Sequence, residues 1–191
     1  MEGTATISIV PTYGSSATLQ YNTATARTAG VEWITPFVAT GGVIIKNTGA
    51  ITTPGAVQIG NNTSVPLNIS AGATLTPGAN LITFHGDFIN AGTLTSGTGG
   101  ITISGTTALQ SIGSFTTTGA VNFTKTSGIA TLTGNANGAA LTINGSGGTL
   151  NLGVGLTHTF TGVVTLTSGV LNGGSSIFIF NFIFNFACFI I

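Results

Sequence analysis

Short β-type runs recur along this chain at a spacing of about 20 residues, and this spacing restricts its possible folds more than any other feature. Leucine in a Thr-Leu-Thr or Thr-Leu-Asn setting occurs at Leu75, Leu94, Leu132, Leu150 and Leu166. The intervals are 19, 38, 18 and 16 residues, and since 38 is twice 19, one copy has diverged near residue 113. A period near 20 with three short strands per period is typical of one turn of a β-solenoid.

Segments between these leucines also read as strands. Eight of them are rich in β-branched or aliphatic residues and end at Gly, Asn or Ser. They lie at residues 43–45, 57–59, 67–69, 81–84, 101–103, 120–123, 141–143 and 163–166. Sustained helical periodicity is absent, and Glu, Lys, Arg and Met are scarce. The pattern predicts about eight to a dozen strands of roughly three to five residues.

We therefore predict an all-β fold, a single elongated parallel β-solenoid with about 20 residues per turn. In Thr-Leu-Thr the leucine points inward and both threonines point outward, because strand side chains alternate between faces. A single turn cannot bury enough apolar surface to fold alone, so neighbouring turns must stack. An antiparallel β-sandwich array is the alternative, since short strands alone do not fix strand direction.

The charge content excludes several classes of partner. Only 3% of the residues are charged, with three basic and three acidic side chains and no net charge. Such a chain cannot form the basic surface that binds nucleic acid phosphates or anionic lipid. The single cysteine, Cys188, excludes an internal disulfide framework.

The chain divides by composition into three segments. Residues 1–40 hold both tyrosines and the only tryptophan and are predicted to form a lead-in or capping unit. Residues 41–175 are the predicted solenoid repeats. Residues 176–191 hold six of the twelve phenylalanines and form an atypical apolar tail. We interpret this tail as sequence that does not belong to the native repeats or, alternatively, as a very apolar strand. The tail is too short to span a bilayer as a helix and has the composition of a cross-β segment, so we expect self-association through exposed edges.

Two histidines and one aspartate are candidates for chemistry. His85 and Asp87 are two residues apart and would share one strand face, as half of a metal or acid–base site. Without a visible third ligand, we interpret them as a surface pair beside a turn. His158 lies in Thr-His-Thr and is interpreted as an isolated strand residue.

Carbohydrate chemistry is the next possibility, because glycosidases generally use two placed carboxylates. Glu2, Glu32 and Asp87 do not cluster in the sequence. Glu32 beside Trp33 could line a sugar platform, but we favour core or cap packing for the tryptophan. Gly86-Asp87 stands alone, whereas calcium-binding solenoids repeat this pair.

Three further motifs have structural interpretations. The glycine-rich residues 97–100 precede a strand, so a phosphate-binding loop is not indicated. Cys188 lies in the apolar tail and is interpreted as an inert thiol. Thr-x-Thr triplets at 74–76, 93–95, 131–133 and 165–167 could form an ice-binding array, although Thr is simply favoured in strands. We predict no catalytic, cofactor or metal site.

The middle of the chain resembles the repeats of large secreted adhesin-like surface proteins of gliding and related bacteria. The matching residues are Gly86, Asp87, Phe88, Asn90, Gly92, Thr93, Leu94, Gly97, Gly105, Gln110, Ile112 and Gly113. The start of the chain resembles the lead-in to such arrays through Tyr13, Leu19, Tyr21, Glu32 and Trp33. The resemblance covers residues 10–174.

This resemblance implies a structural or adhesive stalk segment at the cell surface, with surface glycans or other cell-surface material as partners. A carbohydrate- or ice-binding face is the alternative function. In such proteins the export signal and the sorting domain lie elsewhere in a longer chain. We therefore expect an extracellular fragment without catalytic activity.

Overall fold

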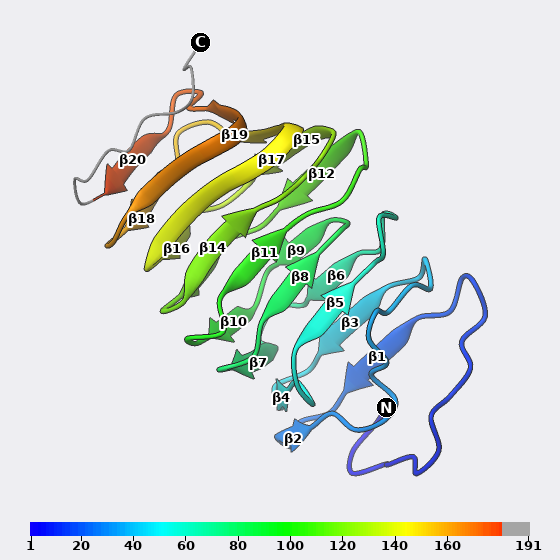
Figure 1. Ribbon diagram of the computed structural model, residues 1–191. Helices are drawn as coiled ribbons and strands as arrows, with labels where there is room; N and C mark the ends of the chain where they lie inside the picture. The colour runs from blue at the N-terminus through cyan, green and yellow to red at the C-terminus, as the bar shows by residue number, and fades with distance from the viewer. Residues whose placement is uncertain (181–191) are drawn as a thin grey trace.

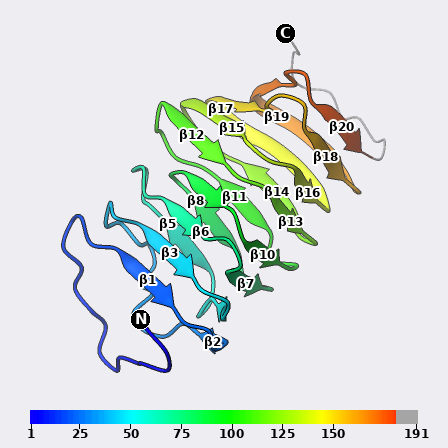
Figure 2. The ribbon, with the colours of Figure 1, turned by 180° about the vertical axis from the view of Figure 1, so that it is seen from behind.

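The computed structural model describes residues 1–180, in which the chain is all-β and its strands run parallel. They stack into a β-solenoid of about 8 turns with about 21 residues per turn, which confirms the predicted fold and the predicted period. The antiparallel alternative is therefore wrong. Figure 1 shows one elongated stack with the chain's start at one end, and Figure 2 shows the same stack from behind. No helix in the described residues is long and apolar enough to cross a membrane.

Each turn contributes strands to three faces, which we number in chain order. Face 1 contains β1 (Leu19–Asn22), β3 (Val43–Lys46), β6 (Leu67–Ile69), β9 (Phe88–Asn90), β12 (Leu109–Ile112) and β15 (Gly128–Leu132). Face 2 is an eight-stranded sheet of β2 (Arg27–Thr28), β4 (Ala50–Thr52), β7 (Thr74–Gly78), β10 (Thr93–Ser96), β13 (Phe115–Thr117), β16 (Ala136–Gly138), β18 (Thr157–Phe160) and β20 (Ile177–Phe180). Face 3 contains β5 (Val57–Ile59), β8 (Ile82–Phe84), β11 (Ile101–Ile103) and β14 (Ala120–Phe123).

Two longer strands join face 3 to face 1. They are β17 (Ala140–Asn151) and β19 (Val164–Asn172). The first half of β17 pairs with β14 on face 3, and its second half pairs with β15 on face 1. The two faces therefore form one continuous 12-stranded sheet.

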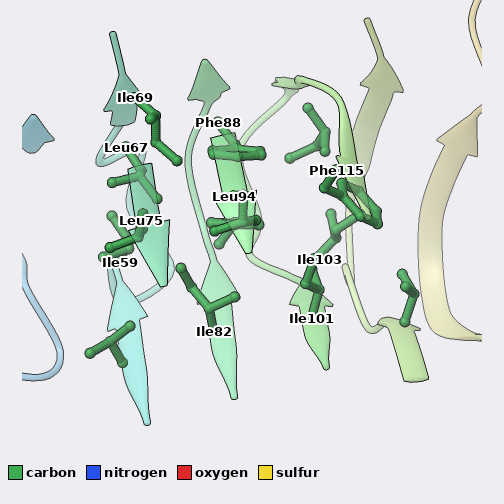
Figure 3. Close-up of a cluster of buried hydrophobic side chains, with 14 of the residues drawn as sticks. Ile59, Leu67, Ile69, Leu75, Ile82, Phe88, Leu94, Ile101, Ile103 and Phe115 are labelled. Atoms are coloured by element: carbon green, nitrogen blue, oxygen red, sulfur yellow. The ribbon is translucent and has the colours of Figure 1, made fainter. Parts of the chain in front are cut away.

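The core consists of columns of like side chains that repeat from turn to turn. On face 3 one inward column consists of Ile59, Phe84, Ile103, Phe123, Ile143 and Leu166. On face 1 a matching column consists of Leu19, Val43, Leu67, Phe88, Ile112 and Leu132. Figure 3 shows side chains of this kind converging on the interior from different faces. Each fully buried aliphatic or phenylalanine side chain contributes about 1.5–3 kcal/mol, so the stack is stabilised along its whole length.

The leucines of the predicted repeat lie on different faces of the solenoid. Leu75 and Leu94 are register partners on face 2, and the diverged copy near residue 113 is Phe115, which continues that column. Leu132 instead lies on face 1, and Leu166 lies on face 3. The alignment of all five leucines into one column is therefore wrong, because strands of any face can carry a leucine between two polar residues.

Strands pair with neighbouring turns at both ends of the described stack. Within residues 1–40, β1 and β2 already pair with the next turn, and Glu2 forms a bridge beside Asn22 along the free edge of β1. At the other end, Ile177–Phe180 pairs in register with β18 as the last described strand of face 2. The start of the apolar tail is therefore a solenoid strand. The rest of the tail lies outside the described residues.

Candidate functional site

The outer surface of face 2 carries two parallel columns of short polar side chains. Five consecutive strands of this face, β7, β10, β13, β16 and β18, present one polar side chain on each side of a single inward residue. These residues, which we call the polar array, are Thr74, Thr76, Thr93, Thr95, Ser114, Thr116, Asn135, Asn137, Thr157 and Thr159. The columns are interrupted by one register shift between Leu94 and Ser96.

Two asparagines of the polar array are held in place by the next turn. Asn135 Oδ1 accepts a hydrogen bond from the Thr157 N–H at 3.0 Å, and Asn137 Oδ1 accepts one from the Thr159 N–H at 3.0 Å. Each amide is therefore fixed through its oxygen, which leaves its NH₂ group at the outer surface. Asn137 Nδ2 makes one long contact of 3.4 Å to Thr116 Oγ1.

The polar array is hollowed at two adjoining places. One hollow of about 280 Å³ is lined by Asn90, Gly92, Thr93, Leu94, Ser114, Phe115, Thr116, Asn135 and Asn137. The second, of about 410 Å³, is lined by Thr116, Thr117, Thr118, Asn137, Gly138, Ala139, Thr159 and Thr161. The two share Thr116 and Asn137. None of the lining residues is charged, so both hollows present only hydroxyl, amide, backbone and apolar atoms.

Only part of this array was visible in the predicted Thr-x-Thr triplets. Residues 74–76 and 93–95 do lie together on face 2. Residues 131–132 lie in β15 on face 1, and residues 165–167 lie in β19, where Thr165 continues a face 3 column. The array is completed instead by Ser-Phe-Thr, Asn-Ala-Asn and Thr-His-Thr, which share a polar-x-polar pattern but are not Thr-x-Thr triplets with an aliphatic centre.

Glu32 is part of a buried polar network in the first turn. The side chain is 1% exposed, and its Oε1 accepts hydrogen bonds of 3.0 Å from the Tyr21 hydroxyl and 3.0 Å from the Gly30 N–H. Arg27 Nη2 lies 3.5 Å from the same oxygen. Burial alone would raise the pKa of the Glu32 carboxyl, but these hydrogen bonds and the Arg27 charge hold it below its ordinary value.

Trp33 belongs to the same end of the core. It is 3% exposed, and its ring stacks on that of Tyr21 with the centroids 5.7 Å apart. The interpretation of Trp33 as packing rather than a sugar platform is therefore correct. Burial, followed by the Glu32 charge, raises the pKa of Tyr21, which keeps its hydroxyl a donor.

His85 and Asp87 do not share a strand face. Residues 85 and 86 form a bend between β8 and β9, and His85 is buried rather than at the surface. His85 Nδ1 accepts a hydrogen bond of 3.2 Å from the Asn62 N–H, whereas Asp87 Oδ1 accepts one of 2.8 Å from the Ser111 N–H. The predicted surface pair is therefore wrong, because the chain turns inward at His85.

His158 is also buried, and both of its ring nitrogens bond to backbone. Nδ1 accepts from the Ala136 N–H at 3.1 Å, so Nε2 carries the proton that it donates to the Leu152 carbonyl at 2.8 Å. Burial lowers the pKa of His158, although the Leu152 bond opposes this shift. His158 is thus a neutral connector between turns rather than an isolated strand residue.

A buried lysine was not anticipated from the sequence. Lys125 is 0% exposed, and its Nζ donates to Thr107 Oγ1 at 3.0 Å. Burial lowers the pKa of Lys125. Burial, followed by the Lys125 charge, lowers the pKa of His85. In the sequence, Lys125 lies among Thr and Ser residues, and nothing there distinguishes it from a surface lysine.

Several residues that carried the sequence resemblance connect neighbouring turns. Gln110 is 2% exposed, and its Nε2 donates to the Gly86 carbonyl 24 residues earlier, at 2.7 Å. Asn90 Nδ2 donates to the Ser114 carbonyl at 2.8 Å, while its Oδ1 accepts from the Gly92 N–H. The motif residues thus act as hydrogen-bonded clamps between turns.

The remaining sequence candidates lie in a corner of the solenoid or outside the described residues. Residues 97–100 form part of the corner between β10 and β11, a strand-to-strand connection as predicted. Within residues 1–180, no group of three or more His, Cys, Asp or Glu side chains is arranged to hold a metal ion. Cys188 lies outside the described residues. No protein-family model, curated protein or solved structure matches this chain.

Proposed function

We propose that this chain is a structural, adhesive stalk segment of a secreted bacterial cell-surface protein. The observation that carries the proposal is the set of clamps between turns. The residues of the quoted motif, Asp87, Asn90 and Gln110, use their side chains to bind the backbone of the following or preceding turn. A motif whose polar residues tie one turn to the next supports a role as an extended scaffold.

The ionisable side chains support the same role. Glu32 is bonded to Tyr21 and Gly30, and His158 is bonded to the backbone of two other segments. Glu32 is engaged within the first turn and His158 between neighbouring turns, so we propose a structural rather than a catalytic function. An extracellular location accords with the resemblance to secreted adhesin-like repeats.

The proposed partners are surface glycans or other cell-surface material, together with further copies of the chain. The last described strand supports self-association. In β20, Ile177 is 61% exposed and Ile179 is 50% exposed, whereas the same column in earlier strands carries polar residues. Exposed apolar strands of this kind favour pairing between molecules.

The test uses the bacterium that encodes the chain and an antibody raised against the purified chain. We expect the antibody to label intact cells, and in-frame deletion of residues 41–175 to lower attachment of cells to surfaces. A strain that carries the restored coding segment is the control. Antigen confined to the cell interior, or unchanged attachment after deletion, would contradict the proposal.

A further inference from the structure

We propose that the two adjoining hollows in the polar array of face 2 bind a neutral glycan. The inference rests on the proposed function, since it names the partner that an adhesive stalk would hold. It starts from two adjoining hollows on the described surface that together cross several strands and combine polar and apolar groups.

The composition of the first hollow matches the two sides of a pyranose ring. The side chains of Leu94 and Phe115 point into the core, so the exposed threonines Thr93 and Thr116 supply both apolar methyl groups and hydroxyls at the surface of this hollow. A sugar ring has an apolar face of C–H groups and a rim of hydroxyls. The C–H face can lie against the threonine methyl groups, while the hydroxyls on the rim exchange hydrogen bonds with side-chain hydroxyls and amides.

The second hollow extends the site across the sheet. The hollows share Thr116 and Asn137, so a ligand in one continues directly into the other. Together they cross β10, β13, β16 and β18. An oligosaccharide of two or more rings fits such a path better than a single compact ligand.

The donors of the site are oriented in advance. Hydrogen bonds of 3.0 Å from the Thr157 and Thr159 N–H groups fix the oxygens of Asn135 and Asn137. Both NH₂ groups then face outward without further loss of side-chain freedom, which lowers the entropic cost of binding. Glycan hydroxyls accept from these amides and both donate to and accept from the neighbouring Thr and Ser hydroxyls.

The charge of the site selects a neutral glycan. The lining of the two hollows contains no charged side chain, and the whole chain has only three basic residues. One of these, Lys125, is fully buried. A uronate or sulfated sugar would therefore lose hydration at this surface without gaining a cationic partner.

The hollows also distinguish a glycan from ice. An ice surface requires a flat, unbroken grid, whereas the polar array is hollowed and its columns shift register after Leu94. The two asparagines are longer than threonine and interrupt the hydroxyl grid in its middle. The surface therefore favours separate sugar rings over a continuous lattice.

The experiment is isothermal titration calorimetry of the full chain with neutral hexasaccharides of glucose and of mannose, and with hexagalacturonate as the anionic comparison. Thr116→Val replaces an exposed hydroxyl by a methyl group at the point where the hollows meet. Thr102→Val makes the same change in the outer column of face 3 and is the matched control.

We expect at least one neutral hexasaccharide to bind, Thr116→Val to weaken it by about tenfold, and Thr102→Val to leave it unchanged. Asn137→Ala should weaken binding as well, and far-ultraviolet circular dichroism checks that each variant is folded. Binding of none of the neutral sugars, or equal effects of the two valine variants, would overturn the site. Thermal hysteresis of ice growth that Thr116→Val abolishes, without sugar binding, would overturn it in favour of ice. Surface location and attachment would still stand in that case, so failure of the site is distinguishable from failure of the proposed function.

Discussion

Replacing Glu32 by alanine is expected to lower the stability of the first turn by roughly 3–5 kcal/mol, the usual cost of removing one partner of a buried charged network. The change removes the acceptor of the Tyr21 hydroxyl and the Gly30 N–H, and it leaves the Arg27 guanidinium without its carboxylate. Trp33, the only tryptophan, stacks on Tyr21, so its fluorescence reports unfolding of this turn during urea denaturation.

Glu2→Ala is the matched control, because the Glu2 side chain is exposed and accepts a hydrogen bond of 3.2 Å from the Asn22 side-chain amide. A surface change of this kind is expected to alter stability by less than about 0.5 kcal/mol. Equal urea midpoints for the two alanine variants would contradict the role given to Glu32.

The pH dependence of the same network has a defined sign. The pKa of the Glu32 carboxyl is lower in the folded chain than in the unfolded chain. Its contribution is therefore complete above the ordinary value of about 4.3 and is lost as the pH falls through the folded-state value. The stability difference between the unmodified chain and Glu32→Gln should accordingly shrink at acidic pH.

Gly100→Ala is expected to destabilise the fold by about 2–5 kcal/mol, because two independent effects coincide there. Gly100 has φ +75°, and an added Cβ would lie 2.3 Å from the carbonyl oxygen of Ala120 in the next turn. The residue occupies the corner before β11, where the backbone of the next turn lies against it. Backbone atoms of a stacked turn cannot move aside without disturbing the ladder.

Three other glycines separate these effects. Gly72 has φ +79° but open space around it. At Gly119, which lacks a positive φ, an added Cβ would lie 2.5 Å from the Gly100 nitrogen. Gly55 has neither. Urea denaturation of the four alanine variants should rank Gly100 as most damaging, Gly72 and Gly119 as intermediate, and Gly55 as neutral. A Gly55 variant as unstable as the Gly100 variant would contradict the account of the corners.

The fold was predictable because faces 1 and 3 bury two aliphatic or aromatic residues in most of their short strands. Val57 and Ile59 of β5 are an example, and so are Ile101 and Ile103 of β11. Face 2 strands such as β10 and β16 instead bury one apolar residue, Leu94 or Ala136, and fill their second buried position with Ser96 or Gly138. The apolar pattern of these strands is therefore weak. For this reason the predicted number of strands, about eight to a dozen, is lower than the number in the described residues.

The polar array could not be assembled from the sequence for a related reason. The spacing between register partners on face 2 varies with the length of the corners. Ile51 and Leu75 are 24 residues apart, whereas Leu75 and Leu94 are 19 apart. Which polar residues become neighbours therefore depends on loops that a periodicity search averages out. The burial of Glu32 and Lys125 could not be predicted from the sequence either, because charged residues are ordinarily exposed.

The central claim is that the turns stack into one rigid rod, and distances between paired spin labels test it most directly. The outer column of face 3 places Gln58, Thr83, Thr102, Asn122, Thr142 and Thr165 on successive turns. Labels on cysteines at these positions, with Cys188→Ser as the background, should separate by about 4.8 Å per turn, so that residues 83 and 165 lie about 19 Å apart. Narrow distributions that lengthen in equal steps are the predicted result. Broad distributions, or separations that do not grow with the number of turns, would contradict the account.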